Sequence, residues 1–249
     1  MVIVSLTTIP SRIPMIYLTI NSILNQTIIP DKIILNIPLA YNNFKNNFTI
    51  PDNLTNHPVI IINRCIDYGP ATKLLGLVSN GILEKLDNED LIIVIDDDRI
   101  YQPTLIENFL KNHNLNPEYA LTVAGWNIET LSDYTCLKTL EPRGIEFIKN
   151  GFIDILGGCC GFALPKKLFP LCEDIIKLDK SDSKYYVDDI WISGFLTLFK
   201  IPIYNIIGTD QIRHPNDSID SLVSNITFAR KKCNNDCIKF FRETYRIWC

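Results

Sequence analysis

The feature that most constrains this chain is a regular alternation between short β-rich apolar runs and helical patterns. Three segments with helical periodicity each begin with a proline, which suits the first turn of a helix. The expected strands span residues 2–6, 32–37, 59–63, 91–95 and 119–123, and the expected helices span 14–25, 70–86 and 103–113. This alternation predicts βαβ units, and therefore an α/β fold with a mostly parallel central sheet flanked by helices.

The second half of the chain has a less regular pattern. It predicts a Gly-rich turn at 157–161, helices at 166–177 and 189–199, and a strand at 203–207, whereas the Asn-rich segment 40–57 is typical of a long surface loop. The 249 residues, 47% of them hydrophobic, are enough to bury one sizeable core. Because the sequence has no internal repeat or low-complexity linker, we expect one domain over residues 1–249.

Charge and composition exclude several classes of protein. A net charge of −4 and a pI near 5.4 argue against nucleic acid as a partner, because that binding needs a broad basic surface. We expect a cytoplasmic protein, since the chain shows neither a signal peptide nor an apolar run of about 18 residues. The basic and aromatic stretch 228–249 allows peripheral contact with a membrane, and simple packing and solvation is the alternative.

Three aspartates, Asp96, Asp97 and Asp98, directly follow the apolar run 91–95. A buried strand must end there, because three ionised carboxylates cannot enter a core without compensation. If the backbone stays extended, Asp96 and Asp98 project to one face and repel each other. A hard divalent cation such as Mn²⁺ or Mg²⁺ would relieve that repulsion, and a solvated cluster without a ligand is the alternative.

Polar residues also follow the first and third expected strands. Thr7, Thr8 and Arg12 follow the first; hydroxyl groups suit a nucleobase edge and a guanidinium suits phosphate oxygens, while helix capping is the alternative. Asp67 and Lys73 follow the third, and a lysine near a helix N-terminus adds positive charge where a diphosphate would bind. In the alternative, Asp67 caps the helix and Lys73 is solvated.

Two later motifs are also candidates, one for its flexible glycines and the other for its paired carboxylates. In GGCCGF, Gly157 and Gly158 allow a backbone to approach a ligand closely, and the two cysteines that follow are interpreted as small packing groups. In VDDIWISGF, Asp188 and Asp189 stand at the head of an apolar helical run, where carboxylates suit the cap and the helix dipole.

VIDDDRIY resembles the Asp-x-Asp motif of the GT-A fold glycosyltransferases, and VSLTTIPSR, DYGPATK, GGCCGF and VDDIW resemble other elements of that fold in the same order. The resemblance, closest to the inverting family 2-like enzymes, implies that Asp96 faces the ribose and Asp98 binds the metal. It places Asp97 near the donor sugar or metal-bound water.

The same resemblance implies roles for the other motifs. It places Thr7, Thr8, Arg12, Asp67 and Lys73 around the nucleotide, and Gly157 and Gly158 along the sugar pocket. Asp189 would be the base that deprotonates the acceptor, with Asp188 as its partner, and His214 would be a further metal ligand that favours Mn²⁺. Trp191 would either stack on a sugar or belong to the core.

The resemblance predicts a metal-dependent transferase with a nucleotide-binding half at 1–125 and an acceptor-side half at 126–249. It would move a sugar from a UDP- or dTDP-linked donor to a glycan, glycoprotein or glycolipid, and a retaining course stays open. One alternative is a nucleotidyltransferase, although TTIPSRIP lacks the Gly-rich basic loop typical of that class. The other is a non-catalytic module that binds sugar nucleotides or glycans.

Overall fold

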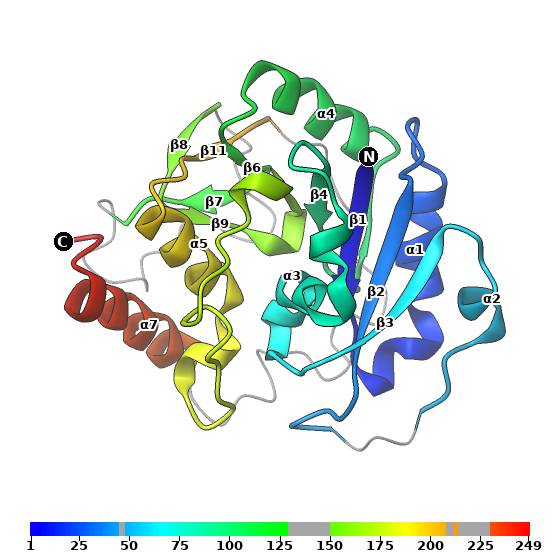
Figure 1. Ribbon diagram of the computed structural model, residues 1–249, viewed down its shortest axis with the longest axis horizontal. Helices are drawn as coiled ribbons and strands as arrows, with labels where there is room; N and C mark the ends of the chain where they lie inside the picture. Colours follow the sequence, from blue (N-terminus) through cyan, green and yellow to red (C-terminus); the bar gives the residue numbers. More distant parts are fainter. Residues whose placement is uncertain (45–47, 129–149, 208–211, 214–229) are drawn as a thin grey trace.

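The computed structural model describes residues 1–44, 48–128, 150–207, 212–213 and 230–249, and it is built around one eight-stranded sheet (Figure 1). Both halves of the chain contribute strands to this sheet. In spatial order the strands are β3 (Ile60–Cys65), β2 (Lys32–Pro38), β1 (Val2–Thr7), β4 (Leu91–Val94), β10 (Phe162–Pro165), β6 (Ala120–Thr122), β11 (Ile203–Asn205) and β8 (Gly151–Ile153).

The sheet is mostly parallel. β3, β2, β1 and β4 pair in parallel, β6 and β11 run in the same direction, and β10 and β8 run opposite to the rest. The chain proceeds outward from β1 to β2 and β3, and then crosses back to β4 on the other side of β1. The strand order therefore reverses between β1 and β4, which is where open α/β sheets form their ligand crevice.

Helices cover both faces of the sheet. The α-helices are α1 (Tyr17–Leu24), α2 (Asp52–Thr55), α3 (Thr72–Leu75), α4 (Leu105–Leu115), α5 (Asp188–Leu198) and α7 (Arg230–Tyr245). The 3₁₀ turns are η1 (Pro10–Met15), η2 (Gly69–Ala71), η3 (Gly76–Gly81), η4 (Leu83–Lys85), η6 (Gly158–Cys160), η7 (Lys166–Leu168) and η8 (Ser183–Tyr186). Four short strands pair outside the main sheet: β5 (Arg99–Ile100) with β12 (Ile212–Arg213), and β7 (Gly125–Trp126) with β9 (Ile155–Leu156).

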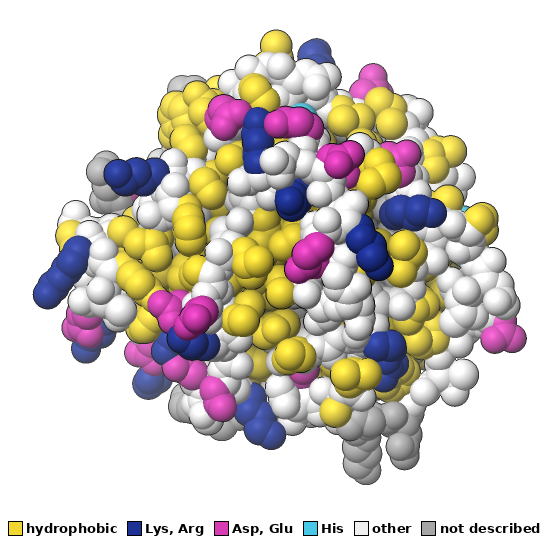
Figure 2. Space-filling view, viewed as in Figure 1, with side chains coloured by type: hydrophobic (Ala, Val, Ile, Leu, Met, Phe, Trp, Pro, Cys, Tyr) yellow, Lys and Arg dark blue, Asp and Glu magenta, His cyan; other side chains and the backbone are white. Residues whose placement is uncertain are grey.

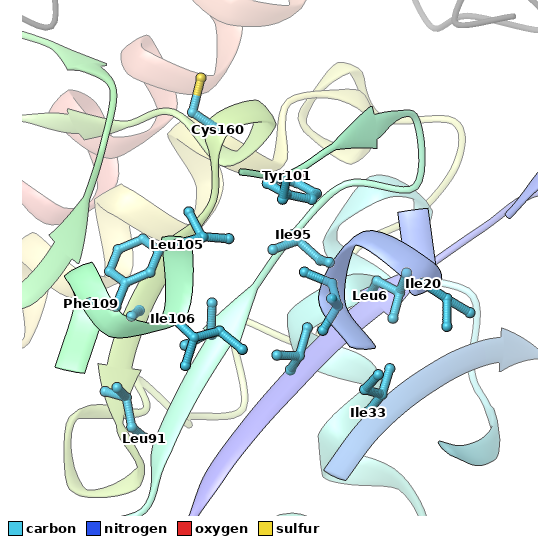
Figure 3. Packing of buried hydrophobic residues seen from close by; sticks show 14 of the residues in the cluster. Leu6, Ile20, Ile33, Leu91, Ile95, Tyr101, Leu105, Ile106, Phe109 and Cys160 are labelled. Atoms are coloured by element: carbon cyan, nitrogen blue, oxygen red, sulfur yellow. The ribbon is translucent and has the colours of Figure 1, made fainter. Parts of the chain in front are cut away.

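The alternation of side chains along each strand divides the core between the two faces. On one face α1 and α4 bury Ile20 and Phe109 against Leu6 of β1 and Ile95, which follows β4 (Figure 3). On the other face α3, η3 and α5 pack against the intervening strand residues, among them Ile92. Because both faces are covered, the central strands are apolar on both sides, as a parallel sheet requires.

The C-terminal helix α7 packs beside α5 at the edge of the molecule (Figure 1). Cys233, Cys237 and Phe241 are buried in that contact, while Lys239 pairs with Glu243 on the exposed side at 3.8 Å. On the face shown in Figure 2, basic and acidic side chains of the described residues are interspersed. None of the helices in the described ranges combines the length and the apolar character needed to cross a bilayer.

The fold-class prediction and the expected strands are confirmed, but two expected helices were wrong. Segment 70–86 is a series of short turns rather than one helix, because Ser79 is extended and Asn80 has a left-handed backbone with φ of 60°. Segment 166–177 keeps only η7 at its start, since Pro170 cannot continue a helix. The segment 40–57, expected to be a loop, contains the one-turn helix α2.

Candidate functional site

The candidate site lies at the carboxyl ends of β1 and β4, the two strands between which the strand order reverses. Thr7 ends β1 and Thr8 follows it, while Asp96, Asp97 and Asp98 follow β4. The strand ends at Val94, in agreement with the expectation that a buried strand does not continue into three carboxylates. The topology therefore brings the two motifs that follow these strands to the same edge of the sheet.

Lys73 connects the aspartate triplet to the pair at the start of α5. Its Nζ lies 2.6 Å from Asp96 Oδ1 and 2.7 Å from Asp188 Oδ2. The Lys73 and Asp188 side chains are 5% and 6% exposed, so this pair interacts in a largely dry environment, whereas the Asp96 side chain is 27% exposed. The alternative in which Lys73 is solvated is therefore excluded in this structure, and one ammonium group holds two carboxylate motifs together.

The electrostatics of this group favour its charged form. Burial would lower the pKa of Lys73, but Asp188, Asp96 and Asp189 together raise it well above its ordinary value. Burial would likewise raise the pKa of Asp96, yet the adjacent Lys73 ammonium, together with Arg99 and Arg12, outweighs burial and lowers it. Lys73 is therefore a cation, and Asp96 an anion, at neutral pH.

Asp189 is held by the Gly-rich turn. The backbone N–H of Gly158 donates to Asp189 Oδ1 at 2.9 Å, and a Cβ at Gly158 would lie 2.6 Å from the same oxygen and 2.7 Å from Lys73 Nζ. A side chain at this position would displace the Asp189 carboxylate and the Lys73 ammonium. The expected approach of this backbone to a ligand stays a prediction. Asp188 Oδ2 lies 2.7 Å from Lys73 Nζ, so both carboxylates contact groups outside α5.

Asp97 belongs to a second group, on the β1 side. Thr8 Oγ1 donates to Asp97 Oδ2 at 2.6 Å, and an Arg12 Nη donates to Asp97 Oδ1 at 2.8 Å. Thr8 is buried, and the Arg12 and Asp97 side chains are 16% and 9% exposed. Asp97 therefore anchors the loop after β1, and Arg12 reaches the triplet from η1.

Asp98 is the least compensated carboxylate of the triplet. Its Oδ2 lies 3.5 Å from the Arg12 Nη, its Oδ1 lies 3.6 Å from Arg99 Nε, and Oδ1 is buried and accepts no hydrogen bond from the described residues. Burial, followed by the charges of Asp96 and Asp97, raises the pKa of Asp98 to about 6.

A buried carboxylate oxygen without a hydrogen-bond donor fits the chemistry of a hard cation ligand. The described residues do not complete such a site by themselves, because they contain no converging group of three His, Cys, Asp or Glu side chains. His214, the other expected ligand, lies outside the described residues.

The sequence interpretation missed several residues that fix the triplet. The hydroxyl of the buried Tyr101 accepts from Asp96 N at 2.9 Å, and Thr19 Oγ1 lies 2.8 Å from the carbonyl oxygens of both Asp97 and Arg99. Tyr101 stands at the end of the core beside Ile95 (Figure 3). Arg99 follows the triplet directly and Tyr101 comes two residues later, so their positions in the sequence could have indicated these contacts. Nothing in the sequence indicated Thr19.

Asp67 and Thr7 make contacts within the scaffold. Asp67 accepts from the backbone N–H of Asn42 at 2.6 Å and from that of Gly69 at 2.9 Å, so its carboxylate joins two loops. Thr7 Oγ1 donates to the carbonyl of Asn36 at 2.8 Å. These bonds give both residues a structural task at the edge of the site.

Two other expected sugar contacts differ in their surroundings. Gly157 is buried, and its N–H donates to Ala124 O at 2.7 Å. Trp191 is 2% exposed, its Nε1 donates to Ile175 O at 2.9 Å, and its ring packs on Phe195. The structure thus favours the core alternative for Trp191, because neither ring face is open to a sugar.

Comparisons with known proteins give matches in structure. No protein-family model matches the sequence, and no curated protein matches it. The structure of S. aureus TarS residues 1–349 has a TM-score of 0.55 at 12% identity and covers 99% of this chain and 72% of that chain. The same TarS segment in complex with UDP-GlcNAc has a TM-score of 0.52 at 12% identity, covering 99% and 73%.

The mannosyltransferase PcManGT from Pyrobaculum calidifontis, in complex with GDP-Man and Mn²⁺, has a TM-score of 0.48 at 15% identity, covering 82% of this chain and 54% of that chain. At 12% identity, the likeness to TarS shows a shared fold. It supports a GT-A-like arrangement for nearly the whole chain and leaves the roles of individual residues to the geometry of the site.

Proposed function

We propose that this chain transfers a sugar from a nucleotide-diphosphate donor, a UDP- or dTDP-sugar, to a hydroxyl group of a glycan, glycoprotein or glycolipid, with inversion at the anomeric carbon. The observation that carries the proposal is the ion bridge from Asp96 through Lys73 to Asp188, which joins the triplet after β4 to the start of α5. The bridge brings the residues expected at the donor to those expected at the acceptor. The likeness to TarS, solved in complex with UDP-GlcNAc, supports a sugar nucleotide as the class of ligand.

The donor would bind across the ends of β1 and β4. Arg12 and Lys73 supply positive charge for the diphosphate, and Asp96 supplies an acceptor for a ribose hydroxyl. A divalent cation, Mn²⁺ or Mg²⁺, would be held by Asp98 and would neutralise charge on the diphosphate as it leaves. Asp97 is already bound to Thr8 and Arg12 and would keep the loop after β1 in position.

The transfer step needs a base on the acceptor side. Asp189 would accept the proton of the acceptor hydroxyl while that oxygen forms a bond to the anomeric carbon. The bond from the anomeric carbon to the diphosphate breaks, and its electron pair leaves with the diphosphate. The N–H of Gly158 fixes the Asp189 carboxylate, and Asp188 holds Lys73 beside it. A single displacement of this kind requires no covalent sugar intermediate.

Ligand-dependent thermal stability tests the donor class, because a ligand that binds the folded state raises its melting temperature. We expect UDP or dTDP with MnCl₂ to stabilise the protein, and UDP alone to stabilise it less. Asp98→Ala should remove the additional rise in melting temperature that Mn²⁺ gives. Asp154→Ala, which removes a carboxylate outside the site, should keep that rise. Equal stabilisation by every nucleotide, or by none, would contradict the proposal.

A further inference from the structure

A row of buried asparagines crosses the sheet face that packs against α3 and η3. Asn36 on β2 and Asn63 on β3 are register partners, are 0% and 2% exposed, and connect to the exposed Asn80 of η3. We call these three residues the asparagine ladder. Buried amides destabilise a core unless they are fully hydrogen-bonded, so their presence at positions that an apolar residue could fill requires a cause.

The ladder is continuous from the surface to the site. Asn80 Nδ2 donates to Asn63 Oδ1 at 2.8 Å, and Asn63 Nδ2 donates to Asn36 Oδ1 at 2.8 Å and to the carbonyl of Gly76 at 2.8 Å. A Cβ at Gly76 would lie 2.7 Å from Asn36 Cγ, so the backbone of η3 rests directly on the ladder. The orientation of the Asn36 amide is thereby fixed from one side.

The amide nitrogen of Asn36 contacts Ser5, the carbonyl of Leu6 at 3.1 Å and the backbone of Lys73. Its Nδ2 donates to Ser5 Oγ at 2.9 Å and lies 3.4 Å from the carbonyl oxygen of Lys73, and Ser5 Oγ donates to that same oxygen at 2.6 Å. Ser5 lies on β1 and is fully buried. Two central strands therefore hold the main chain of the residue whose ammonium bridges Asp96 and Asp188.

The hydrogen bonds to the Lys73 carbonyl matter for the site because α3, which contains Lys73, is a single turn between 3₁₀ segments. So short a helix fixes its own position poorly. The side-chain bonds to the Lys73 carbonyl tie this turn to the sheet, and the triplet follows the neighbouring strand β4 of the same sheet.

We propose that Ser5 and Asn36 are positioning residues that act through Lys73: they hold its ammonium group where the donor diphosphate binds, and Asn63 and Asn80 keep the Asn36 amide in its orientation. The inference rests on the proposed function for the identity of the ligand. The position of the ammonium group is measurable without that ligand.

The first test observes Lys73 directly. In protein labelled with ¹⁵N-lysine, the Lys73 ammonium should give a slowly exchanging signal, identified by its loss in Lys73→Gln. Ser5→Ala and Asn36→Leu should shift it or broaden it toward the exchange behaviour of exposed lysines. Gln26→Leu is the matched control: it removes another buried amide with several hydrogen bonds but leaves Lys73 untouched, so the signal should remain. An unchanged Lys73 signal in Ser5→Ala and Asn36→Leu overturns the inference.

The second test connects the position to ligand binding through a double-mutant cycle on the affinity for UDP with MnCl₂. Ser5→Ala should weaken binding about fivefold, the size of one lost hydrogen bond. In the Lys73→Gln background the same substitution should have no further effect. A loss that persists there means that Ser5 acts otherwise and overturns the inference. If the unmodified protein does not bind UDP or dTDP, the proposed donor class fails, and the ammonium signal still decides whether Ser5 and Asn36 position Lys73.

Discussion

The site has two sides that solve the same electrostatic problem differently. On the Lys73 side, one ammonium lies within 2.7 Å of both Asp96 and Asp188. On the Arg12 side, Asp97 has close partners, but Asp98 is separated from the Arg12 and Arg99 guanidinium nitrogens by 3.5 and 3.6 Å. The Lys73 side has one cation for its two bridged carboxylates, and the Arg12 side has two cations, Arg12 and Arg99. The least compensated carboxylate, Asp98, is nevertheless on the Arg12 side.

In this site, distance and burial therefore determine how well a carboxylate is compensated more than the number of nearby cations does. On the Lys73 side Asp96 and Asp188 each lie close to the ammonium and Asp189 accepts from the Gly158 N–H, which suits fixing groups in place. The Arg12 side retains a carboxylate, Asp98, whose pKa is raised to about 6 and whose buried oxygen accepts no hydrogen bond from the described residues. We therefore assign positioning to the first side and cation binding to the second.

The substitution with the largest expected effect tests whether the Lys73 side also contains the base that deprotonates the acceptor. Asp189→Asn keeps the shape of the side chain and its acceptor for the Gly158 N–H but cannot accept a proton, so turnover should fall about 100- to 10,000-fold. Donor affinity should stay close to that of the unmodified protein. Steady-state kinetics together with calorimetric titration separate these quantities. Undiminished turnover would remove Asp189 from the mechanism.

Lys73→Met should have the next largest effect, because it leaves Asp96 and Asp188 without their shared partner. Breaking a buried ion pair on one side destabilises a protein by about 3 kcal/mol or more, and donor affinity should fall as well. Urea unfolding measures the loss. Lys167→Met is the control, since that lysine pairs with Glu89 and Glu118 on the surface and should change stability little. Equal effects of the two substitutions would contradict the assigned difference between buried and exposed pairs.

Gly158→Ala should disturb the Lys73 side without removing a charge. The added Cβ would lie 2.6 Å from Asp189 Oδ1 and 2.7 Å from Lys73 Nζ, so both groups must move. Turnover should fall about 10- to 100-fold, since small displacements of catalytic groups are costly. Gly151→Ala is matched in chemistry but meets nothing within 4 Å, and its turnover should be unchanged. Parallel kinetics of the two variants provide the comparison.

The smallest expected effect concerns the Arg12 side and is a pH dependence of the stabilisation by MnCl₂. Because the folded-state pKa of Asp98 is raised to about 6, its contribution to stability is complete below the unfolded value near pH 4 and is lost as the pH rises through about 6. A cation that binds the ionised carboxylate offsets this loss. MnCl₂ should therefore raise the melting temperature more at about pH 7.5 than at about pH 5. An equal shift at both pH values would contradict the assignment.

The sequence predicted the parts of this molecule that depend on local pattern. The central strands and the end of β4 before the triplet follow from apolar runs and the cost of burying carboxylates. The prediction of a helix at 70–86 was wrong because the helical periodicity of the sequence continues through Asn80. The backbone there is left-handed, and the Asn80 amide binds Asn63 and Arg64.

The partners of the site residues depend on tertiary structure and could not be predicted from spacing. Lys73 and Asp188 are distant in the chain and meet only because α3 and α5 cover the same face of the sheet. Asp97 received the least definite role from the sequence, and the structure gives it two close partners, Thr8 and Arg12. For Trp191 the sequence left core and sugar contact open, because a tryptophan on an amphipathic helix suits both.

The most direct measurement of the central claim is ¹H NMR of the protein incubated with a panel of UDP- and dTDP-sugars, MnCl₂ and a mixture of glycan acceptors. We expect consumption of at least one donor and a new anomeric signal with the configuration opposite to that of the donor, with both absent in Asp189→Asn. A product that retains the donor configuration, or no consumption of any donor in the panel, would contradict it.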